Sequence, residues 1–435
     1  MLDIKFIREN KDIVKETIKN KRGNIDLDDL FKIDEERLTL LSRVEFLRGE
    51  QNKVSVSMGG TLTTEARKQL IEEMRLVKDE LKEKEEDLRN ITSKWQSIML
   101  KIPNIPTADT PFGVDETGNQ VVRQWGEIPT FSFSPKEHFE IGKALGLIDT
   151  ETAAEVASSR FSYIKGDLVL MQFAILQMCL NVLTNEEKLK EIAKNAGLSI
   201  NVSKFIPVIP PVFVRPLVQV KMARFMAPED HYMFPNDDLM LIGSAEHTLG
   251  SMYMNKIFEE EELPIRYAGY STAFRREAGA AGKDTNGILR QHQFDKLEME
   301  VFSLPENSIQ EQNFLVAIQE HILQELKLPY QVVAICVGDM GFPDTRQIDI
   351  ETWMPGQNKY RETHSSDFTG GFQSRRLNTR VRRKDGKIEP VHMNDATVVA
   401  IGRILIAIIE NYQQADGTIK IPEVLQKYLG KEIIS

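Results

Sequence analysis

Cysteine is nearly absent from this chain, since only Cys179 and Cys336 occur among its 435 residues. Two thiols cannot build a disulfide framework or a cysteine-rich metal site, so we expect neither, and no zinc. No apolar run approaches the roughly 20 residues that a membrane span needs. The opening MLDIKFIREN lacks the apolar core and small-residue cleavage site of a secretory signal. We therefore expect a cytoplasmic protein that does not associate with membranes.

A large excess of positive charge is missing as well. The formal net charge is −10, with 55 lysines and arginines against 65 aspartates and glutamates. This balance argues against a protein that coats nucleic acid, but it allows local clusters of Lys and Arg. The length exceeds one ordinary domain of about 100–200 residues, so two or three domains are expected.

Apolar residues repeat at steps of three and four over residues 28–58 and 63–102, after a short helical cap over 1–27. This spacing predicts two coiled-coil helices, with Gly59 and Gly60 as the turn between them. At 1.5 Å per residue the second helix would be about 60 Å long. One interpretation is a structural or dimerising arm. The other is an antiparallel hairpin that reaches a large partner. The length of the helices favours this second interpretation, because a narrow apolar seam buries too little surface for stability to explain helices this long.

Prolines end the arm, at positions 103, 106 and 111 in KIPNIPTADTPFG, and predict an extended linker. We expect two domains, residues 1–104 and 105–435. In the second, helices and strands alternate irregularly, which favours an α+β fold on a mainly antiparallel sheet over a doubly wound one. The predicted helices are 135–146, 150–156, 167–183, 185–196 and 396–413, and the predicted strands are 205–209, 265–273, 296–302, 331–337 and 346–353.

The densest polar stretch covers residues 271–302. Its AGAAGKDT segment is not a phosphate loop of the Walker type, because Glu277 and Asp284 stand where that motif needs Gly and Ser or Thr. The glycines at 279, 282 and 287 instead suit a loop between two antiparallel strands. The first strand would end in FRRE (274–277), and the second would run through QFDKLE (293–298).

Alternation along these strands would place Arg275 and Glu277 on one face, and Phe294, Lys296 and Glu298 on a common face. A guanidinium can fork onto a phosphate or a carboxylate, and an aromatic ring can stack on a base. A surface ion-pair ladder on a hairpin is the alternative interpretation.

A second polar group lies towards the C-terminus, where Glu351, Glu362, Ser365 and Asp367 fall in a short span. Arg403 follows inside an apolar segment, where a lone guanidinium is costly unless it is paired or binds an anion. A buried salt bridge would satisfy it. Together with the arginines, these carboxylates also suit a nucleotide bound with a divalent metal.

The motifs resemble a known family. FRREAG…RQHQFDKLEMEVF is similar to motif 2 of the class II aminoacyl-tRNA synthetases. GDMGF…DIETWMPGQNKYRE, followed by IGRILIAIIENYQQADG, resembles the region through motif 3 of seryl-tRNA synthetases, and MLDIKFIREN with IDEERLTLL resembles their N-terminal part. The resemblance runs in order over nearly the whole chain. It implies a homodimer that activates L-serine with ATP and Mg²⁺ and charges tRNA(Ser), and also tRNA(Sec).

The resemblance also implies roles for single residues. Arg275 would hold the α-phosphate and the serine carboxylate, Phe294 would stack on adenine, and Arg403 would lie on the γ-phosphate side. Glu362 and Ser365 would hold ATP and its Mg²⁺. The implied catalytic residues are Arg275, Glu362 and Arg403, and the remaining ATP-binding residues are Arg276, Glu277, Thr363 and His364.

For serine, IGSAEHT (242–248) takes the place of the family's Thr-x-Glu loop, which implies contacts from Ser244, Ala245 and Glu246. Glu298 would read the serine hydroxyl, with Arg275 and Thr397 beside the substrate. The implied tRNA-binding residues lie on the arm and are Arg48, Lys53, Arg67, Lys68 and Arg75. Pro210 and Pro211 match the motif 1 prolines of the dimer interface.

This chain departs from the family pattern at several positions. Ser244 replaces the usual Thr, Arg276 a common Ser, and Asp395 the common Asn near the serine pocket. The SSDF run replaces an SCSN-type run at and after Ser365, and the segment 184–205 is longer than usual.

Three functions fit the sequence. The first is a serine–tRNA ligase. In its reaction the carboxylate of the substrate serine is the nucleophile, which needs positioning and charge stabilisation rather than a strong base. The second is a serine-activating paralogue with a non-tRNA acceptor, and the third is a non-catalytic RNA-binding relative. The long arm disfavours the second, and the retained charged residues disfavour the third.

Overall fold

The computed structural model describes residues 1–58, 63–225, 227–278, 284 and 286–435. The chain divides into two compact units, Met1–Pro103 and Asn104–Ser435. The domain boundary predicted after residue 104 lies one residue later in the chain than the observed boundary after Pro103. The expected turn at Gly59 and Gly60 lies outside the described residues, as do Gly279 and Gly282 of the predicted motif 2 loop.

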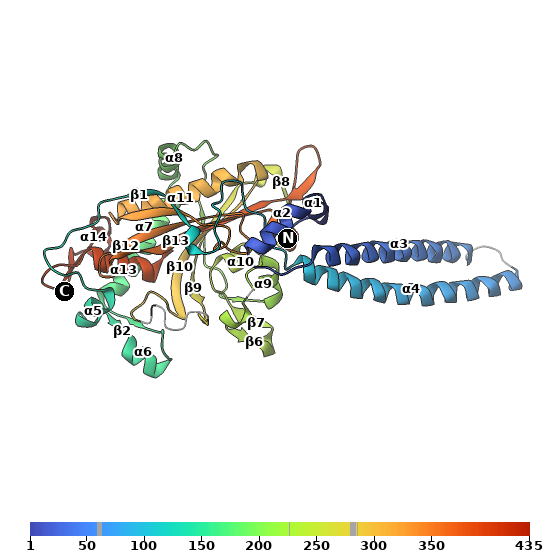
Figure 1. The fold of residues 1–435 in the computed structure, drawn as a ribbon, viewed down its shortest axis with the longest axis horizontal. Helices are drawn as coiled ribbons and strands as arrows, with labels where there is room; N and C mark the ends of the chain where they lie inside the picture. The colour runs from blue at the N-terminus through green and yellow to red at the C-terminus, as the bar shows by residue number, and fades with distance from the viewer. Residues whose placement is uncertain (59–62, 226, 279–283, 285) are drawn as a thin grey trace. The chain divides into compact units, whose positions relative to one another are not determined.

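The first unit is helical and ends in a long hairpin (Figure 1). Its helices are α1 (Ile4–Glu9), α2 (Lys11–Asn20), α3 (Leu27–Met58) and α4 (Thr64–Met99). Val44, Leu47 and Leu81 are buried where α3 meets α4, with Val77 and Leu88 packed against them. These are seam positions of the apolar repeat, so the predicted helical hairpin is confirmed.

The base of the hairpin contains a buried ionic group. Asp34 is 2% exposed and accepts hydrogen bonds from Arg8 at 2.9 Å and Arg37 at 2.8 Å. Burial raises the pKa of Asp34, but the two guanidinium groups outweigh it and hold the pKa below its usual range. The Arg37 guanidinium also lies 4.7 Å from the centre of the Trp95 ring. Arg37 therefore contacts a buried carboxylate on one side and an aromatic ring on the other.

The second unit is built on an eight-stranded sheet in the order β1-β11-β12-β13-β16-β10-β9-β4. All neighbours are antiparallel except β4 and β9. This sheet confirms the expected α+β fold. The strands are β1 (Gln120–Trp125), β4 (Ile206–Val208), β9 (Ile265–Phe274), β10 (Gln293–Ser303), β11 (Tyr330–Ala334), β12 (Arg346–Met354), β13 (Lys359–Gly370) and β16 (His392–Ala400).

Three helices pack most extensively around this sheet: α7 (Asp167–Leu183), α11 (Ser308–Glu325) and α13 (Ile401–Asn411). Gln319 of α11 donates hydrogen bonds to the backbone carbonyls of Ser365 at 2.9 Å and Thr397 at 2.7 Å. The shorter helices are α5 (His138–Ala144), α6 (Thr150–Val156), α8 (Glu186–Asn195), α9 (Pro216–Met222), α10 (Glu246–Leu249), α12 (Phe372–Leu377) and α14 (Glu423–Leu429).

Short strands form four smaller sheets around the large one. They are β8 (Ile257–Glu259) with β14 (Arg380–Arg382) and β15 (Ile388–Pro390), β5 (Phe213–Val214) with β6 (Met233–Phe234) and β7 (Leu239–Leu241), β2 (Ile148–Asp149) with β3 (Tyr163–Ile164), and β17 (Ile419–Lys420) with β18 (Ile433–Ile434).

Two local predictions are wrong. The segment 396–413 is not one helix, because β16 continues to Ala400 and α13 begins at Ile401. Residues 397–399 are β-branched and pair with β10, an environment that favours a strand. The strand β9 ends at Phe274, and Glu277 has a φ of 52°, so Arg275 and Glu277 do not alternate on one strand face.

Both cysteines are free and fully buried. Burial raises the pKa of the Cys179 thiol to about 12. Among the described residues no single helix is long and apolar enough to cross a membrane. The bent pair of α7 and α8 reaches that length and composition only together.

Candidate active site

A pocket of about 230 Å³ lies where β10, β13 and β16 meet the start of α13. It collects residues that are far apart in the sequence. Those of the predicted site residues that line it are Glu246, Arg275, Glu277, Phe294, Glu298, Glu362, Thr363, Ser365, Thr397 and Arg403.

Arg275 stands at the rim, directly after the last residue of β9. Its backbone N–H donates to the His292 carbonyl at 2.9 Å, which continues the pairing of the two chains beyond the strand. Its Nε donates to the Gly243 carbonyl at 3.1 Å, and the guanidinium lies 5.3 Å from the centre of the Phe294 ring. An arginine and an aromatic ring therefore lie together at the rim, and Arg275 remains exposed.

The neighbouring residues diverge. The Glu277 carboxylate pairs with Arg290 at 2.5 Å and lines the pocket. Arg276 points elsewhere, since its guanidinium lies 5.8 Å from the centre of the Tyr232 ring and it is not a lining residue. The structure therefore does not bring Arg276 to the pocket.

Arg403 and Glu362 face each other from α13 and β13. The guanidinium lies 2.8 Å from the carboxylate. Burial opposes the charge on Glu362, but the Arg403 charge prevails and lowers its pKa. The Glu362 side chain is still 48% exposed, so it can accept a further ligand.

A hydrogen-bonded group centred on Glu298 occupies another part of the pocket. Thr397 and Ser244 each donate a hydroxyl to Glu298 at 3.2 Å. The Ser244 hydroxyl also lies within hydrogen-bond distance of Glu246, so its single proton can go to either carboxylate, and Lys296 contacts the Glu298 carboxylate. Ser244 and Ala245 are fully buried behind Glu246 and Glu298 and do not line the pocket themselves.

The pKa values of the two carboxyl groups in this cluster, Glu298 and Glu246, are shifted in opposite directions. Burial raises the pKa of Glu298 to about 7, and the nearby Glu246 charge adds to it against the effect of Lys296. Burial also disfavours ionisation of Glu246, but the charges of Lys296 and Arg224 hold its pKa well below the usual range. The site therefore combines one firmly ionised carboxylate with one that titrates near neutral pH.

Residues 363 to 365 differ in their access to the pocket. The Ser365 hydroxyl lies inside and donates to Asp367 at 3.0 Å. Thr363 reaches the lining, but its hydroxyl is hydrogen bonded to Thr352 at 2.7 Å. His364 is buried and does not line the pocket, because its Nε2 is bonded to the Val398 carbonyl at 3.1 Å and its Nδ1 to Thr363 at 2.9 Å.

Sequence reasoning gave no role to several residues of the pocket. Lys296 shares the predicted strand face of Phe294 and Glu298, so the alternation alone could have identified it as a pocket residue. Arg224 lies in an irregular segment after α9 and carries no sequence signal, yet it lines the pocket together with Asp367 and Asp395. Arg290 and Gln291 also line it.

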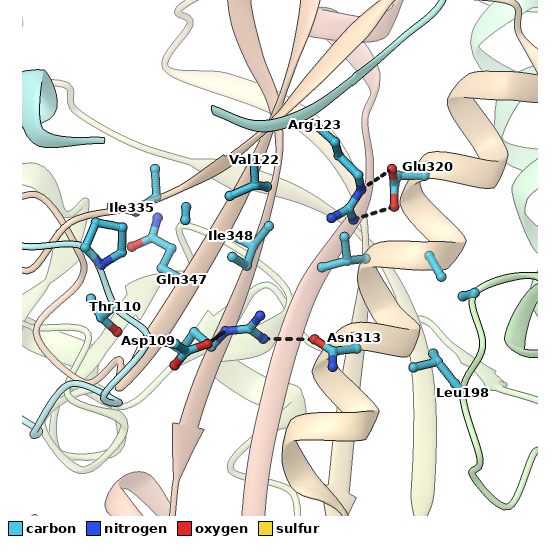
Figure 2. Close-up of a pocket in the computed structure, with 16 residues that line it drawn as sticks. Asp109, Thr110, Val122, Arg123, Leu198, Asn313, Glu320, Ile335, Gln347 and Ile348 are labelled. Atoms are coloured by element: carbon cyan, nitrogen blue, oxygen red, sulfur yellow. Dashed lines mark hydrogen bonds and ion pairs between the residues drawn. The ribbon is translucent and has the colours of Figure 1, made fainter. Parts of the chain in front are cut away.

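A second pocket lies between β1, α11 and β12, and none of the predicted site residues lines it (Figure 2). Arg123 and Glu320 face each other there at 2.6 Å. Arg346 lies 3.1 Å from Asp109 and donates to Asn313 at 2.9 Å. The charged side chains of this second pocket are thus paired with one another or with a neighbouring amide.

The candidate tRNA-binding residues all lie exposed on the hairpin. Arg48 pairs with Glu85 across α3 and α4 at 2.8 Å, Lys53 with Glu50 at 2.6 Å, and Arg75 with Glu72 at 2.8 Å. Arg67 and Lys68 lie in the first turns of α4. Exposed ion pairs of this kind contribute about 0–1 kcal/mol and can be exchanged for phosphate contacts.

The fold and the pocket agree with the comparisons to known families. The core-domain model of class II tRNA synthetases (G, H, P, S and T) matches residues 232–412, which span most of the pocket. The second unit is therefore a class II aminoacyl-tRNA synthetase core. The model of the seryl-tRNA synthetase N-terminal domain matches residues 1–106.

Relatives extend this match over the full length. The serine–tRNA ligases of Thermodesulfovibrio yellowstonii and Desulfitobacterium hafniense (strain Y51) are each 39% identical, with 100% of both chains covered. The seryl-tRNA synthetase of Pyrococcus horikoshii, solved with ATP, is 36% identical with a TM-score of 0.86, covering 100% of this chain and 99% of that one. The cytoplasmic serine–tRNA ligase of Naegleria fowleri, solved with AMP, is 29% identical with a TM-score of 0.81 and the same coverage. The chain belongs to the seryl-tRNA synthetase family.

Proposed function

We propose that this chain is an ATP-dependent serine–tRNA ligase, which forms seryl-adenylate and transfers the seryl group to tRNA(Ser). The observation that carries the proposal is the convergence of Arg275, Arg403 and Glu298 on one pocket in a chain of this family. Two guanidinium groups suit a polyphosphate, and a buried carboxylate suits a hydroxyl. That the enzyme also charges tRNA(Sec) stays a prediction.

Within this proposal, ATP occupies the end of the pocket lined by Arg275, Phe294 and Arg403. Phe294 stacks on the adenine, and the Arg275 guanidinium stabilises the charge that develops on the α-phosphate. The ATP complex of the Pyrococcus horikoshii relative supports nucleotide binding. No protein base is required, because the attacking serine carboxylate is already an anion.

Serine lies at the other end, beside Glu246, Glu298 and Thr397. The ionised Glu246 suits the α-ammonium of the substrate, and Glu298 accepts the hydroxyl proton in a hydrogen bond. An amino acid without a hydroxyl leaves Glu298 without that partner, so the pocket penalises alanine.

The residues also fit Mg²⁺, which prefers oxygen ligands and usually binds through a few carboxylates together with substrate phosphates. Glu362 offers a partly exposed carboxylate, and Ser365 offers a hydroxyl that lines the same pocket. Burial, followed by the nearby Glu362 and Asp367 charges, raises the pKa of Asp349 well above its usual range, and a cation bound at Glu362 would lower that pKa again. Bound there, Mg²⁺ would neutralise phosphate charge.

We further propose a homodimer through the segment around β4. β4 is an edge strand of the large sheet. Beside it, Ile209 is 85% exposed, Leu217 is 63% exposed and Phe213 is 46% exposed. Several large exposed apolar side chains in one short segment are typical of an interface.

The test is serine-dependent ATP–pyrophosphate exchange, together with charging of tRNA(Ser). Wild-type protein should perform both reactions, and Arg275→Ala should lose both while keeping its unfolding temperature. Exchange without charging would favour the paralogue with another acceptor. Loss of both reactions in the wild type would favour the non-catalytic relative and refute the proposal.

A further inference from the structure

Arg224 sits in the pocket without any role in the proposed chemistry. It follows α9 by two residues, after Ala223 in a left-handed conformation with φ 58°. Its side chain is only 15% exposed, although a guanidinium is among the groups most costly to bury without partners. Burial of this kind requires partners of opposite charge.

Those partners come from three separate elements. The Arg224 guanidinium lies 3.2 Å from Asp395 of β16, 3.3 Å from Asp367 of β13, and 3.5 Å from Glu246 of α10. Asp344, in the loop between β11 and β12, lies 4.0 Å away. One cation thus connects two strands of the sheet to the loop that carries Ser244 and Glu246.

The sheet register explains why a cation is needed. Asp367 and Asp395 are direct partners across β13 and β16. Like charges directly opposite each other destabilise a strand pair. The Arg224 guanidinium lies within 3.3 Å of both carboxylates and so places a positive charge between them. The guanidinium therefore holds two aspartates close together at the wall of the pocket.

The position of Arg224 relates it to the amino-acid end. It contacts Glu246, and the Ser244 hydroxyl lies within hydrogen-bond distance of both the Glu246 and the Glu298 carboxylates. Glu246, Asp344, Asp367 and Asp395 all lie within 4.0 Å of the Arg224 guanidinium. Arg275 and Arg403 have partners of their own, Gly243 and Glu362.

We propose that Arg224 is a positioning residue that determines amino-acid specificity. Its guanidinium, with Asp367 and Asp395, forms the wall of the serine end of the pocket and fixes the Glu246 carboxylate. The wall leaves room for a side chain of the size of serine and excludes longer polar ones. This inference rests on the proposed serine activation.

Two variants test it. Arg224→Lys keeps the charge but loses the planar fork that holds several carboxylates at once. A triple variant, Arg224→Ala with Asp367→Asn and Asp395→Asn, removes the cation together with the two aspartate charges closest to it, and Glu246 keeps Lys296 as a cationic neighbour at 4.0 Å. The matched control is Arg383→Ala, which removes a guanidinium held by Glu306 at 2.7 Å, Glu260 at 3.3 Å and Glu389 at 3.7 Å, outside the pocket lining.

The readout is ATP–pyrophosphate exchange with serine, homoserine and asparagine, alongside the unfolding temperature. In the triple variant we expect the KM for serine to rise at least tenfold and the KM for ATP to stay within twofold. The preference for serine over homoserine should fall at least tenfold. Arg224→Lys should lie between the triple variant and the wild type, and Arg383→Ala should keep wild-type values for both substrates.

Unchanged serine KM and unchanged selectivity in both variants would overturn the inference. So would a parallel rise of both KM values that follows the loss of unfolding temperature, because that pattern indicates a purely structural role. If the wild type exchanges no serine, the proposed function fails as well. If the wild type exchanges serine but the Arg224 variants keep wild-type selectivity, the inference fails while the proposed function stands.

Discussion

The guanidinium of Arg403 donates a hydrogen bond of 2.9 Å to the backbone carbonyl of Glu362 and lies 2.8 Å from its carboxylate. The first turn of α13 is thereby joined to β13 at the pocket. Because Glu362 remains half exposed, the pair both fixes this corner and leaves a carboxylate edge open to a ligand.

Arg403→Ala should lower serine-dependent ATP–pyrophosphate exchange by about 10²–10³-fold, as expected when one positioned charge that stabilises a transition state is lost. The change should appear in kcat more than in the KM for serine. Arg382→Ala is the control, since it removes an exposed arginine paired with Glu259 at 2.5 Å. Exchange at the wild-type rate in a folded Arg403→Ala protein would contradict the assignment.

Glu298→Ala should raise the KM for serine at least tenfold and reduce discrimination against alanine, because the proposed acceptor for the serine hydroxyl is lost. Glu298→Gln should retain part of the affinity, since an amide oxygen still accepts from Thr397. Binding of ATP should change little in either variant. The experiment fails the idea if selectivity over alanine stays constant.

Stability should depend on pH through the same residue. The native pKa of about 7 exceeds the ordinary value of 4.5, so folding favours the protonated form of Glu298. Its stabilising contribution is complete below pH 4.5 and disappears as the pH rises through 7. At about 1.4 kcal/mol per pKa unit, wild type should lose about 3 kcal/mol relative to Glu298→Gln between pH 4.5 and 8. Denaturant unfolding of both proteins measures this, and a constant difference would rule it out.

Shortening the hairpin should separate the two half-reactions. Replacing residues 50–76 with a short Gly/Ser turn removes Lys53, Arg67, Lys68 and Arg75 but keeps the buried contacts of Val44, Leu47 and Leu81. Serine activation should persist, while charging of tRNA(Ser) should fall at least a hundredfold.

Binding of tRNA to the full-length protein should weaken with rising salt, because neutralised phosphates release counterions. A smaller salt slope is expected for Arg67→Glu with Lys68→Glu. Normal charging by the shortened protein would show that the arm does not grip tRNA.

Ile209→Asp should convert the proposed homodimer into monomers, because it introduces a charge among the exposed apolar side chains around β4. Light scattering coupled to size exclusion gives the mass directly. Val56→Asp, at an equally exposed position on the hairpin, is the control and should leave the mass unchanged. A wild type that is monomeric at micromolar concentration would refute the interface.

The sequence predicted those parts of the fold that repeat or carry long motifs. The heptad spacing located the seam at Val44, Leu47 and Leu81, and the motifs identified ten lining residues of the pocket. The segment 396–413 was misassigned because a run of buried apolar residues does not distinguish a central strand from a buried helix. No sequence pattern indicated Arg224. Its role depends on the pairing of Asp367 with Asp395 across two strands, and residues so far apart in the sequence are seen to be partners only in the structure.

The two buried thiols have a practical consequence for spectroscopy. A thiol with a pKa near 12 and no exposed surface reacts slowly with maleimides, and Cys336 is equally enclosed. A cysteine introduced at Lys68 would then be the accessible nucleophile for a fluorophore, with both native cysteines left in place. Energy transfer from such a probe to labelled RNA could follow docking at the arm in real time.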